Sequence, residues 1–327
     1  MEKNGFTPII ASDGMALELL KKEFPHLLAL EMPSYNIQYP KNGAYLKWKI
    51  IRNSPKMIWA IYKEKRMVSK WITQYEIRGI ISDNRLGAFS KKIPSVFITH
   101  QLTVLSGNTT RLTSMLHQNI IKKYTECWVP DVEGTPNLSG KLGHLKNPFD
   151  RIRYIGPLSR MEKMAVEKKY DLLVILSGPE PQRSILEVRL RNEILKFSGK
   201  VIFIKGILEP EQKMEITDHV TYYNFIHSAE LQQAFNESEM VLSRSGYTTI
   251  MDLAHLQKKA FFIPTPGQYE QEYLARKLKK EGVTPYAKQD DFRIRDLSEV
   301  DLYWGLQSFN HHTDWKKLLS VFRPLSK

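Results

Sequence analysis

The sequence predicts an α/β protein with two doubly wound parallel-sheet domains that face each other across a cleft. Short apolar runs bounded by turn residues alternate with longer amphipathic stretches, which is typical of repeated β-α-β units. The alternation stops near residue 160 in a charged segment and then restarts. A chain of 327 residues is long enough for two such domains, each with its own core.

We expect the first domain to span residues 1–160. Strands are predicted at residues 6–11, 79–82, 95–100, 126–130 and 151–156, and helices at residues 58–75 and 111–124, where apolar side chains recur near helical spacing. Residues 1–5 are typical of a helix end closed by Gly5, so residues 6–11 look like a second strand. Because doubly wound sheets start from a central strand, we expect the first strand of this domain to be missing.

We expect the second domain to span residues 161–327. Its strands are predicted at residues 171–176, 201–206, 220–225, 240–244 and 260–264, with a helix at 183–196 and terminal helices over residues 302–322. Two such domains in tandem place a cleft at the carboxyl ends of their strands, where open α/β sheets bind ligands.

The net charge of +13 lies almost entirely in the first domain, with +12 in residues 1–160 and +1 in the remainder. This bias favours an anionic partner, either a membrane surface or a phosphorylated acceptor. A solvated basic face is the alternative. The chain shows neither a basic motif interleaved with aromatic residues nor a helix-turn-helix signal, so no nucleic-acid partner is expected.

The sequence also bears on location and on metals. No stretch approaches the roughly 18 apolar residues of a spanning helix, and the first residues lack signal-peptide order. We therefore expect a cytoplasmic protein, with peripheral contact to an anionic membrane as an option. The single cysteine, Cys127, has no Cys/His cluster around it at metal spacing, so neither a metal site nor a cofactor is expected.

Three strand-to-helix junctions in the second domain carry residues suited to a phosphorylated ligand. Free N–H groups and the positive end of the helix dipole bind phosphate at such junctions. The residues expected to contact the ligand are Ser177, Gly178 and Arg183 in the first junction, Ser245, Gly246, Thr248 and Asp252 in the second, and Gln268, Glu270 and Gln271 in the third. Ordinary βα turns and solvated helix residues are the alternative explanation.

These junctions resemble the C-terminal domain of the MurG-type glycosyltransferases, family 28, which have the GT-B fold of two Rossmann-like domains and use UDP-N-acetylglucosamine. SRSGYTTIMDLA is similar to the family's Ser-Arg-(Ala/Ser)-Gly segment. The resemblance implies that Arg244 helps to bind the nucleotide and that Asp252, where Glu is usual, binds the ribose diol. It also implies that the main chain of Phe225 and Ile226 meets uracil.

IPTPGQYEQEYLA is similar to the family's donor-sugar segment and implies a sugar contact for Gln271, although the family's second Gln is Glu272 here. The N-terminal half resembles the family's acceptor domain more loosely, through IISDNRLGAF, PSVFITHQL and CWVPD. The family's glycine-rich acceptor-phosphate loop would precede Met1, so we expect that loop to be missing as well.

The resemblance implies an inverting, metal-independent transfer of a hexosamine from a UDP-sugar to a hydroxyl of a glycan or lipid-linked acceptor. Asp83 and His100 are the candidate general bases, because both are predicted at strand ends facing the cleft. Asp83 as the cap of its own turn and His100 as a half-buried structural histidine are the alternatives, and His144 is a weaker candidate. A UDP-sugar 2-epimerase or a catalytically inactive nucleotide-sugar-binding protein are the alternative functions.

Overall fold

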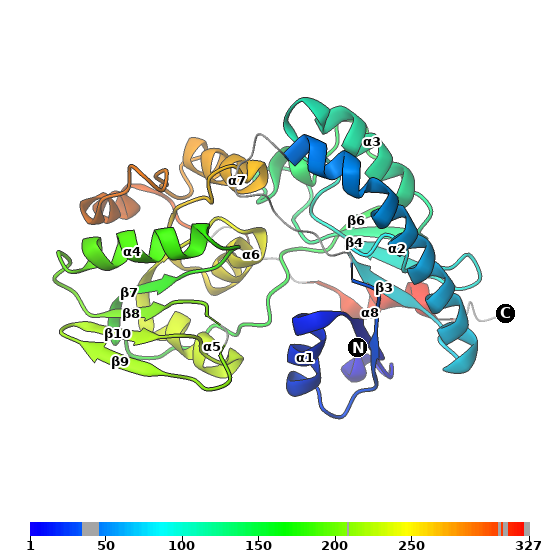
Figure 1. The fold of residues 1–327 in the computed structure, drawn as a ribbon, viewed down its shortest axis with the longest axis horizontal. Helices are drawn as coiled ribbons and strands as arrows, with labels where there is room; N and C mark the ends of the chain where they lie inside the picture. Colours follow the sequence, from blue (N-terminus) through cyan, green and yellow to red (C-terminus); the bar gives the residue numbers. More distant parts are fainter. Residues whose placement is uncertain (35–45, 208, 307–308, 310–312, 324–327) are drawn as a thin grey trace.

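The chain folds into two lobes, each built around a parallel sheet (Figure 1). The computed structural model describes residues 1–34, 46–207, 209–306, 309 and 313–323, and for residues 46–57 it describes the backbone alone. The predicted α/β class with two parallel sheets is confirmed.

The main sheet of the N-terminal lobe has four parallel strands in the order β3-β4-β5-β6. They are β3 (Ile80–Asp83), β4 (Ser95–Ile98), β5 (Glu126–Val129) and β6 (Ile152–Tyr154), close to the predicted positions. Alternation along the strands gives the sheet two apolar faces. One face carries Phe97, Cys127 and Val129, and the other carries Val96 and Trp128.

Helices α2 (Leu46–Gln74) and α3 (Thr110–Ile121) cover the first of these faces. Val68 of α2 packs near Ile80 of β3, while Ile121 at the end of α3 packs against Phe97. The predicted helix at 58–75 therefore extends further toward the N-terminus, whereas the predicted helix at 111–124 has nearly the expected bounds. Short 3₁₀ turns, η3 (Gly107–Thr109) and η4 (Gly140–Leu142), lie in the loops after β4 and β5.

The first residues form a separate pair of parallel strands, β1 (Ile10–Ser12) and β2 (Ala29–Glu31), joined by helix α1 (Gly14–Glu23). The preceding turn, η1 (Glu2–Asn4), ends at Gly5 with φ 81°, as the predicted glycine cap requires. Arg85, which follows β3, links this pair to the main sheet by ion pairs with Asp13 and Glu64. Among the described residues, β1 pairs with β2 alone, and the absence of a first strand stays a prediction.

The C-terminal lobe holds a six-stranded sheet in the order β12-β11-β7-β8-β10-β9, parallel except for the edge strand β9. Apolar runs form its buried strands, as predicted. The strands are β7 (Tyr170–Ile175), β8 (Val201–Ile204), β9 (Met214–Thr217), β10 (Val220–Tyr223), β11 (Ser238–Ser243) and β12 (Lys259–Phe262).

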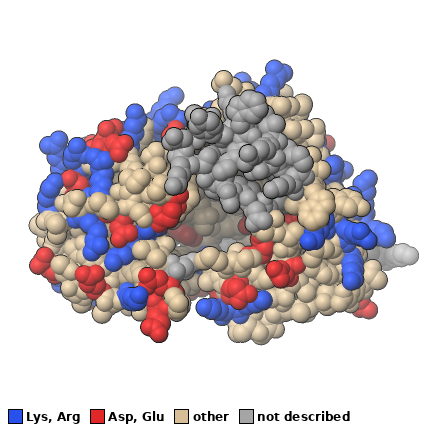
Figure 2. All heavy atoms as spheres, in the orientation of Figure 1, with Lys and Arg blue, Asp and Glu red and all other residues tan. Residues whose placement is uncertain are grey.

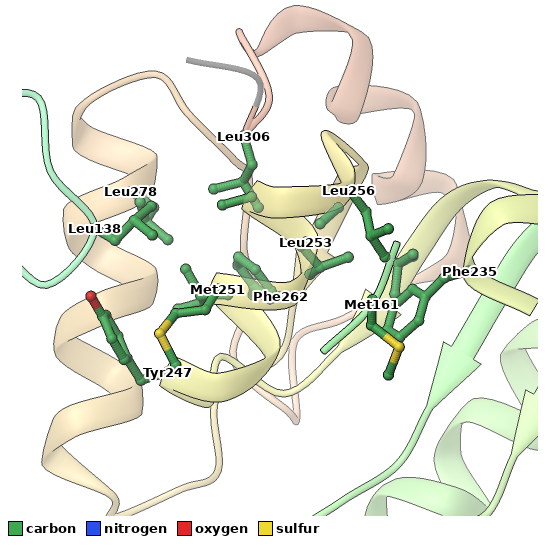
Figure 3. Packing of buried hydrophobic residues seen from close by; sticks show 14 of the residues in the cluster. Leu138, Met161, Phe235, Tyr247, Met251, Leu253, Leu256, Phe262, Leu278 and Leu306 are labelled. Atoms are coloured by element: carbon green, nitrogen blue, oxygen red, sulfur yellow. The ribbon is translucent and has the colours of Figure 1, made fainter. Parts of the chain in front are cut away.

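Helices cover both faces of this sheet. On one face, α5 (Ser228–Glu237), α6 (Tyr247–Leu256) and α7 (Tyr269–Lys280) enclose a large apolar cluster (Figure 3). On the other, α4 (Gln182–Ile194) and the 3₁₀ segment η5 (Ile294–Leu302) pack over Leu172 and Val174. Leu138, from a loop of the N-terminal lobe, also packs into the first cluster, so the two lobes share part of a core.

The end of the chain returns to the N-terminal lobe. Helix α8 (Trp315–Leu318) and turn η6 (Leu319–Phe322) lie against the second face of the N-terminal sheet, where Leu319 and Phe322 pack with Val96 and Trp128. The sequence predicted terminal helices as part of the second domain. The structure instead makes residues 313–322 a cover for the first sheet.

Candidate functional site

The three predicted junctions lie side by side at one edge of the C-terminal sheet. They follow β7, β11 and β12, which are neighbours in the order β12-β11-β7 and run parallel. Their carboxyl ends therefore meet at a single edge, next to a hollow between the two lobes (Figure 2).

The junction after β7 offers an open approach to the main chain. Ser177 and Gly178 are exposed, and Gly178 has φ 104°, a conformation that favours glycine. The side chain of Thr265, at the neighbouring junction, lies near Gly178. Thr265 is 2% exposed, and its hydroxyl has no hydrogen-bond partner among the described residues. The turn thus combines exposed main chain with a buried polar atom.

Arg183 does not lie as the sequence predicted. Its guanidinium is already engaged by the carboxylates of Glu180 (2.6 Å) and Glu187 (2.7 Å) and by the carbonyl oxygen of Lys205 (3.0 Å). Burial opposes the charged form, but the hydrogen bonds that the guanidinium donates to Glu187 and Glu180 hold the pKa of Arg183 above its usual value. A side chain with its charge so balanced has little charge left to neutralise a diphosphate, and the donor contact of Arg183 stays a prediction.

The junction after β11 places an exposed helix start at the site. Gly246 is the N-cap of α6, its extended backbone has open space around it, and Thr248 in the first turn is exposed. Ser245 is fully buried and donates its hydroxyl hydrogen to the carbonyl oxygen of Gln271 at 2.9 Å. Ser245 therefore ties two junctions together, which is a supporting role rather than the ligand contact that we predicted.

Arg244 also has a different place from the predicted one. It is 1% exposed, and its guanidinium donates to main-chain carbonyl oxygens after β12 and to the side chain of Gln289 at 2.7 Å. Burial lowers the pKa of Arg244 to about 10, so the side chain stays charged at neutral pH. The implied contact of Arg244 with a nucleotide stays a prediction. Arg244 lies beneath the site and holds two loops in place.

Asp252 lies on α6, where its carboxylate accepts a hydrogen bond of 2.7 Å from the hydroxyl of Ser159 in the segment between the lobes. Burial raises the pKa of Asp252, and the Ser159 hydrogen bond opposes that change. A buried carboxylate with a single hydroxyl donor has capacity for further donors.

The junction after β12 begins α7, with Gln268 as its N-cap. The amide oxygen of Gln271 accepts from the main-chain N–H of Thr265 at 2.9 Å, and Glu272 accepts from that of Gly267. Glu270 is different, because its carboxylate crosses to the other lobe and meets His100 and Gln101. The predicted sugar contact of Glu270 is therefore replaced, in this structure, by a contact between the lobes.

Phe225 and Ile226 lie half-buried in the loop from β10 to α5, and Ile226 packs against the apolar cluster beneath α5, α6 and α7. The main-chain N–H of Phe225 donates to the side chain of Asn224 at 2.9 Å. Asn224 is buried and fixes the path of this loop. The predicted main-chain contact with uracil thus lies on a loop whose path is held by the hydrogen bonds of Asn224.

The two predicted bases lie at the carboxyl edge of the N-terminal sheet. Asp83 ends β3, and His100 follows β4, the neighbouring strand. Burial raises the pKa of Asp83, and the nearby His100 opposes this rise. The ring of His100 stacks on Tyr247 of α6, with centroids 4.1 Å apart and planes 9° apart. His100 therefore lies where the two lobes meet.

Comparison with known proteins places the second lobe in a family. Residues 181–303 match the model of the glycosyltransferase family 28 C-terminal domain. The matched residues include the second and third junctions. This lobe is a family 28 glycosyltransferase domain.

Two relatives extend the likeness beyond that domain. A UDP-N-acetylglucosamine–N-acetylmuramyl-(pentapeptide) pyrophosphoryl-undecaprenol N-acetylglucosamine transferase from Haemophilus ducreyi is 26% identical over 57% of this chain. That match spans 56% of the relative's own length. An uncharacterised glycosyltransferase from Methanopyrus kandleri is 20% identical over 93% of this chain and 91% of its own length.

Solved structures confirm the predicted GT-B fold. The crystal structure of Acinetobacter baumannii MurG is 13% identical and covers 92% of this chain and 82% of its own, with a TM-score of 0.53. The kitacinnamycin glycosyltransferase is 12% identical and covers 97% and 92%, with a TM-score of 0.61. The expected GT-B fold and the expected family 28 C-terminal domain are thus confirmed.

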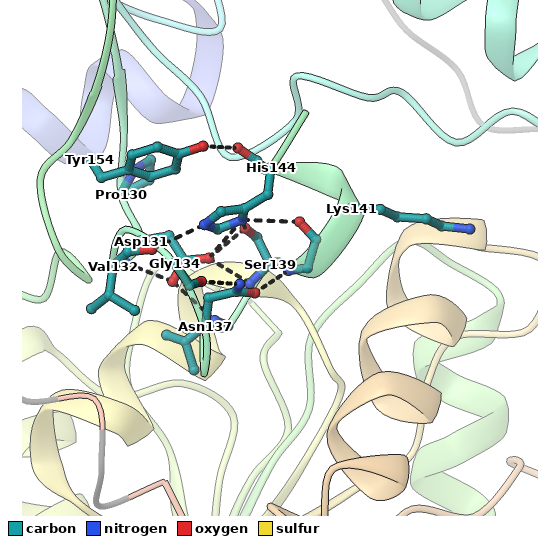
Figure 4. Close-up of polar contacts among 12 residues, drawn as sticks. Pro130, Asp131, Val132, Gly134, Asn137, Ser139, Lys141, His144 and Tyr154 are labelled. Carbon is teal, nitrogen blue, oxygen red and sulfur yellow. Dashed lines mark hydrogen bonds and ion pairs between the residues drawn. The ribbon is translucent and has the colours of Figure 1, made fainter. Parts of the chain in front are cut away.

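A loop of the N-terminal lobe, residues 130–144, docks on the family 28 domain (Figure 4). The fully buried carboxylate of Asp131 organises it by accepting the main-chain N–H groups of Val132, Leu138 and Ser139. Tyr247 donates its hydroxyl hydrogen to the carbonyl oxygen of Pro130 at 2.9 Å, and Tyr273 accepts from the main-chain N–H of Lys141. The sequence gave no signal for this contact, because its partners are more than 100 residues apart.

His144, the weaker base candidate, belongs to this loop. Its two ring nitrogens lie 3.1 Å and 3.0 Å from the carbonyl oxygens of Gly140 and Val132, and its ring stacks on Tyr154. These contacts are those of a structural histidine. In the described part of the chain, no group of three or more His, Cys, Asp or Glu side chains has metal-binding geometry, and no helix has the length and apolarity needed to cross a bilayer.

Proposed function

We propose that this protein transfers a hexosamine, N-acetylglucosamine in the first instance, from a UDP-sugar to an acceptor hydroxyl with inversion. The observation that supports this most is the meeting of three strand-to-helix junctions at one sheet edge, with His100 of the other lobe beside them. The name of the Haemophilus ducreyi relative supports the choice of sugar.

In this proposal the diphosphate lies over the exposed main chain at Ser177 and Gly178 and the half-buried Gly246, with Thr248 adding a hydroxyl. The starts of α4, α6 and α7 supply the positive field that stabilises departing UDP, without a metal ion. The ribose hydroxyls donate to Asp252, and uracil meets the main chain of Phe225 and Ile226. Gln268 and Gln271 contact the sugar.

The acceptor hydroxyl loses its proton to a base at the edge of the N-terminal sheet. His100 is the base that we propose, because it lies directly against the family 28 domain. Asp83 lies near it, and its raised pKa suits a proton acceptor or an electrostatic partner of the imidazolium.

We further propose that the acceptor is lipid-linked and that the N-terminal lobe contacts an anionic membrane from the cytoplasmic side. Exposed apolar side chains gather on the two helices that cover one face of the N-terminal sheet. They are Ile58, Trp59 and Tyr62 on α2, and Leu112, Met115 and Leu116 on α3. Exposed basic side chains, among them Lys63, Arg66 and Arg111, lie on the same helices. Apolar and basic groups together are typical of peripheral binding.

A UDP-sugar 2-epimerase, the second function considered from the sequence, needs acidic groups around the donor sugar. Glu270 is engaged by His100 and Gln101, and Glu272 by the main chain of Gly267. The acids on α7 are thus already bound to protein groups, which favours transfer over epimerisation.

Calorimetry with UDP, UDP-N-acetylglucosamine, GDP and NAD tests the donor assignment, first without metal and then with magnesium. We expect selective binding of UDP and its sugar, with equal affinity in both conditions. Asp252→Asn should weaken UDP binding about tenfold, because it removes a charge-assisted hydrogen bond that contributes about 1.5–3 kcal/mol. Asp290→Asn, at an exposed carboxylate, is the control. A folded protein that binds none of the four would favour the inactive-protein alternative.

A further inference from the structure

His100 and Glu270 belong to different lobes but form a close pair. His100 follows β4, and Glu270 lies in the first turn of α7, 170 residues later in the chain. The ring Nε2 of His100 lies 2.7 Å from one carboxylate oxygen of Glu270, and the side-chain amide of Gln101 donates to the other. Both partners are partly shielded from water, with side chains 17% and 29% exposed. Glu270 is thus held from the N-terminal lobe through both of its oxygens.

A second contact fixes the plane of the His100 ring. The ring lies flat on Tyr247, 4.1 Å from centroid to centroid. Tyr247 is 3% exposed, and its hydroxyl is anchored to the carbonyl oxygen of Pro130. Stacking fixes where the imidazole lies, and the carboxylate of Glu270 fixes its rotation within that plane. Both groups come from the family 28 domain.

The contact with Glu270 determines which nitrogen of a neutral His100 ring carries the proton. Such a ring has one N–H group and one nitrogen with a free lone pair. A carboxylate accepts hydrogen bonds but does not donate them when ionised, so the proton of His100 lies on Nε2 and the lone pair on Nδ1. When Nδ1 takes up a proton, the same carboxylate stabilises the imidazolium that forms, as the buried aspartate does in a serine-protease triad.

We propose that Glu270 is a positioning residue that sets the tautomer of His100, so that the general base is complete only when the two lobes are closed. This inference rests on the proposed transfer function. The acceptor O–H gives its proton to Nδ1 of His100, and its oxygen forms a bond to the anomeric carbon. The bond from that carbon to the diphosphate oxygen breaks, and UDP leaves with the electron pair.

The tautomer is directly measurable without any substrate. Long-range ¹H–¹⁵N spectra of ¹⁵N-labelled protein distinguish a protonated ring nitrogen from an unprotonated one, and loss of the signal in His100→Asn identifies His100. We expect a protonated Nε2 and an unprotonated Nδ1 in the neutral ring, and a mixture of both tautomers in Glu270→Ala. Glu272→Ala, which removes an acid of the same helix that binds Gly267 instead, should keep the wild-type tautomer. A protonated Nδ1 in the wild type, or no change in Glu270→Ala, would overturn the proposal.

Kinetics separate positioning from sugar binding. The reaction to follow is release of UDP from UDP-N-acetylglucosamine, with water in place of the unidentified acceptor. Glu270→Ala should lower kcat about 10- to 100-fold and leave KM for the donor within about twofold, while Glu270→Asp recovers part of the rate. A raised KM at unchanged kcat would make Glu270 a sugar ligand and refute the positioning role. Failure of the donor assignment would show separately, as absence of UDP binding in calorimetry.

Discussion

Arg244 and Asp252 lie eight residues apart in one segment, and the structure gives them opposite roles. Arg244 is 1% exposed and holds three main-chain oxygens, from two places in the chain. Asp252 has one hydroxyl partner and capacity for more. A positively charged side chain beside a nucleotide site is easily assigned to phosphate. The hydrogen-bond partners of Arg244 indicate a structural role instead.

Substitution of Arg244 is therefore expected to affect folding more than donor binding. Arg244→Ala leaves several buried carbonyl oxygens without donors, at about 1–3 kcal/mol each. We expect the free energy of unfolding in urea to fall by about 3 kcal/mol or more. Arg189→Ala, which removes a surface ion pair with Asp290, should cost about 0.5 kcal/mol or less. A variant of unchanged stability that no longer binds UDP would return Arg244 to the nucleotide site.

The sequence predicted the positions of the junction glycines and of Asp83 and His100 at strand ends, because that signal is local, and their roles stay predictions. Gly178 and Gly246 follow apolar runs directly, and the pattern of a strand ending in a glycine turn is contained in a few residues. The sequence could not show the protein partners of Arg183 and Arg244, because the acids and carbonyl groups that engage them are set by helix phase and by loops up to 62 residues away. Glu270 was assigned to the sugar because its partner is in the other lobe.

At the scale of elements, one glycine after β8 decides how closely two strand ends can approach. Gly206 has φ 68°, and a Cβ built there would lie 2.3 Å from the carbonyl oxygen of Leu176 at the end of β7. This contact precedes the loop at Ser177, so it sets the path of the chain into the first junction. Alanine cannot be accommodated without moving main-chain atoms.

Gly206→Ala is accordingly expected to lower the free energy of unfolding by about 3 kcal/mol, from backbone strain of about 1–2 kcal/mol together with the clash. Gly134→Ala is the matched control, because Gly134 has φ 85° but no atom within 4 Å of a built Cβ. Gly134→Ala should lower the free energy of unfolding by the backbone strain alone. Chemical denaturation measures both. Equal losses for the two variants would contradict the role of the close approach.

Most strands could be predicted because buried parallel strands are continuous apolar runs between turn residues. Two strands were missed for definite reasons. β2 has only three residues, too few to show a period. All four residues of β9 are exposed, so no alternation of buried and exposed residues marks it as a strand. Edge strands of this kind are formed by hairpin geometry and main-chain pairing with β10 rather than by apolar pattern.

At the scale of the whole molecule, the charge bias favours the N-terminal lobe for the proposed membrane contact. Nearly all of the net charge of +13 belongs to residues 1–160, and the exposed apolar residues of α2 and α3 lie in the same lobe. The charge bias was readable from the sequence. Which apolar residues are exposed was not, because a helix pattern does not tell a buried stripe from a docking face.

We expect the protein to sediment with phosphatidylglycerol vesicles at low salt and to be released by salt, which screens the basic groups. A double change of Leu112 and Leu116 to Ser should reduce the bound fraction several-fold, because it removes apolar contact from α3. Val188→Ser, at a 65% exposed position on α4 of the other lobe, should leave it unchanged. Equal sedimentation of all three proteins would exclude α3 as the contact.

The chain passes between the lobes twice, and the two passages are joined. The first leaves β6 through Ile155. Phe309 lies in the core of the family 28 domain, and the hydroxyl of Thr313 donates to the carbonyl oxygen of Ile155 at 2.6 Å. Because this hydrogen bond holds the two segments side by side, they permit rotation of the lobes about their common line and resist sliding of one lobe over the other.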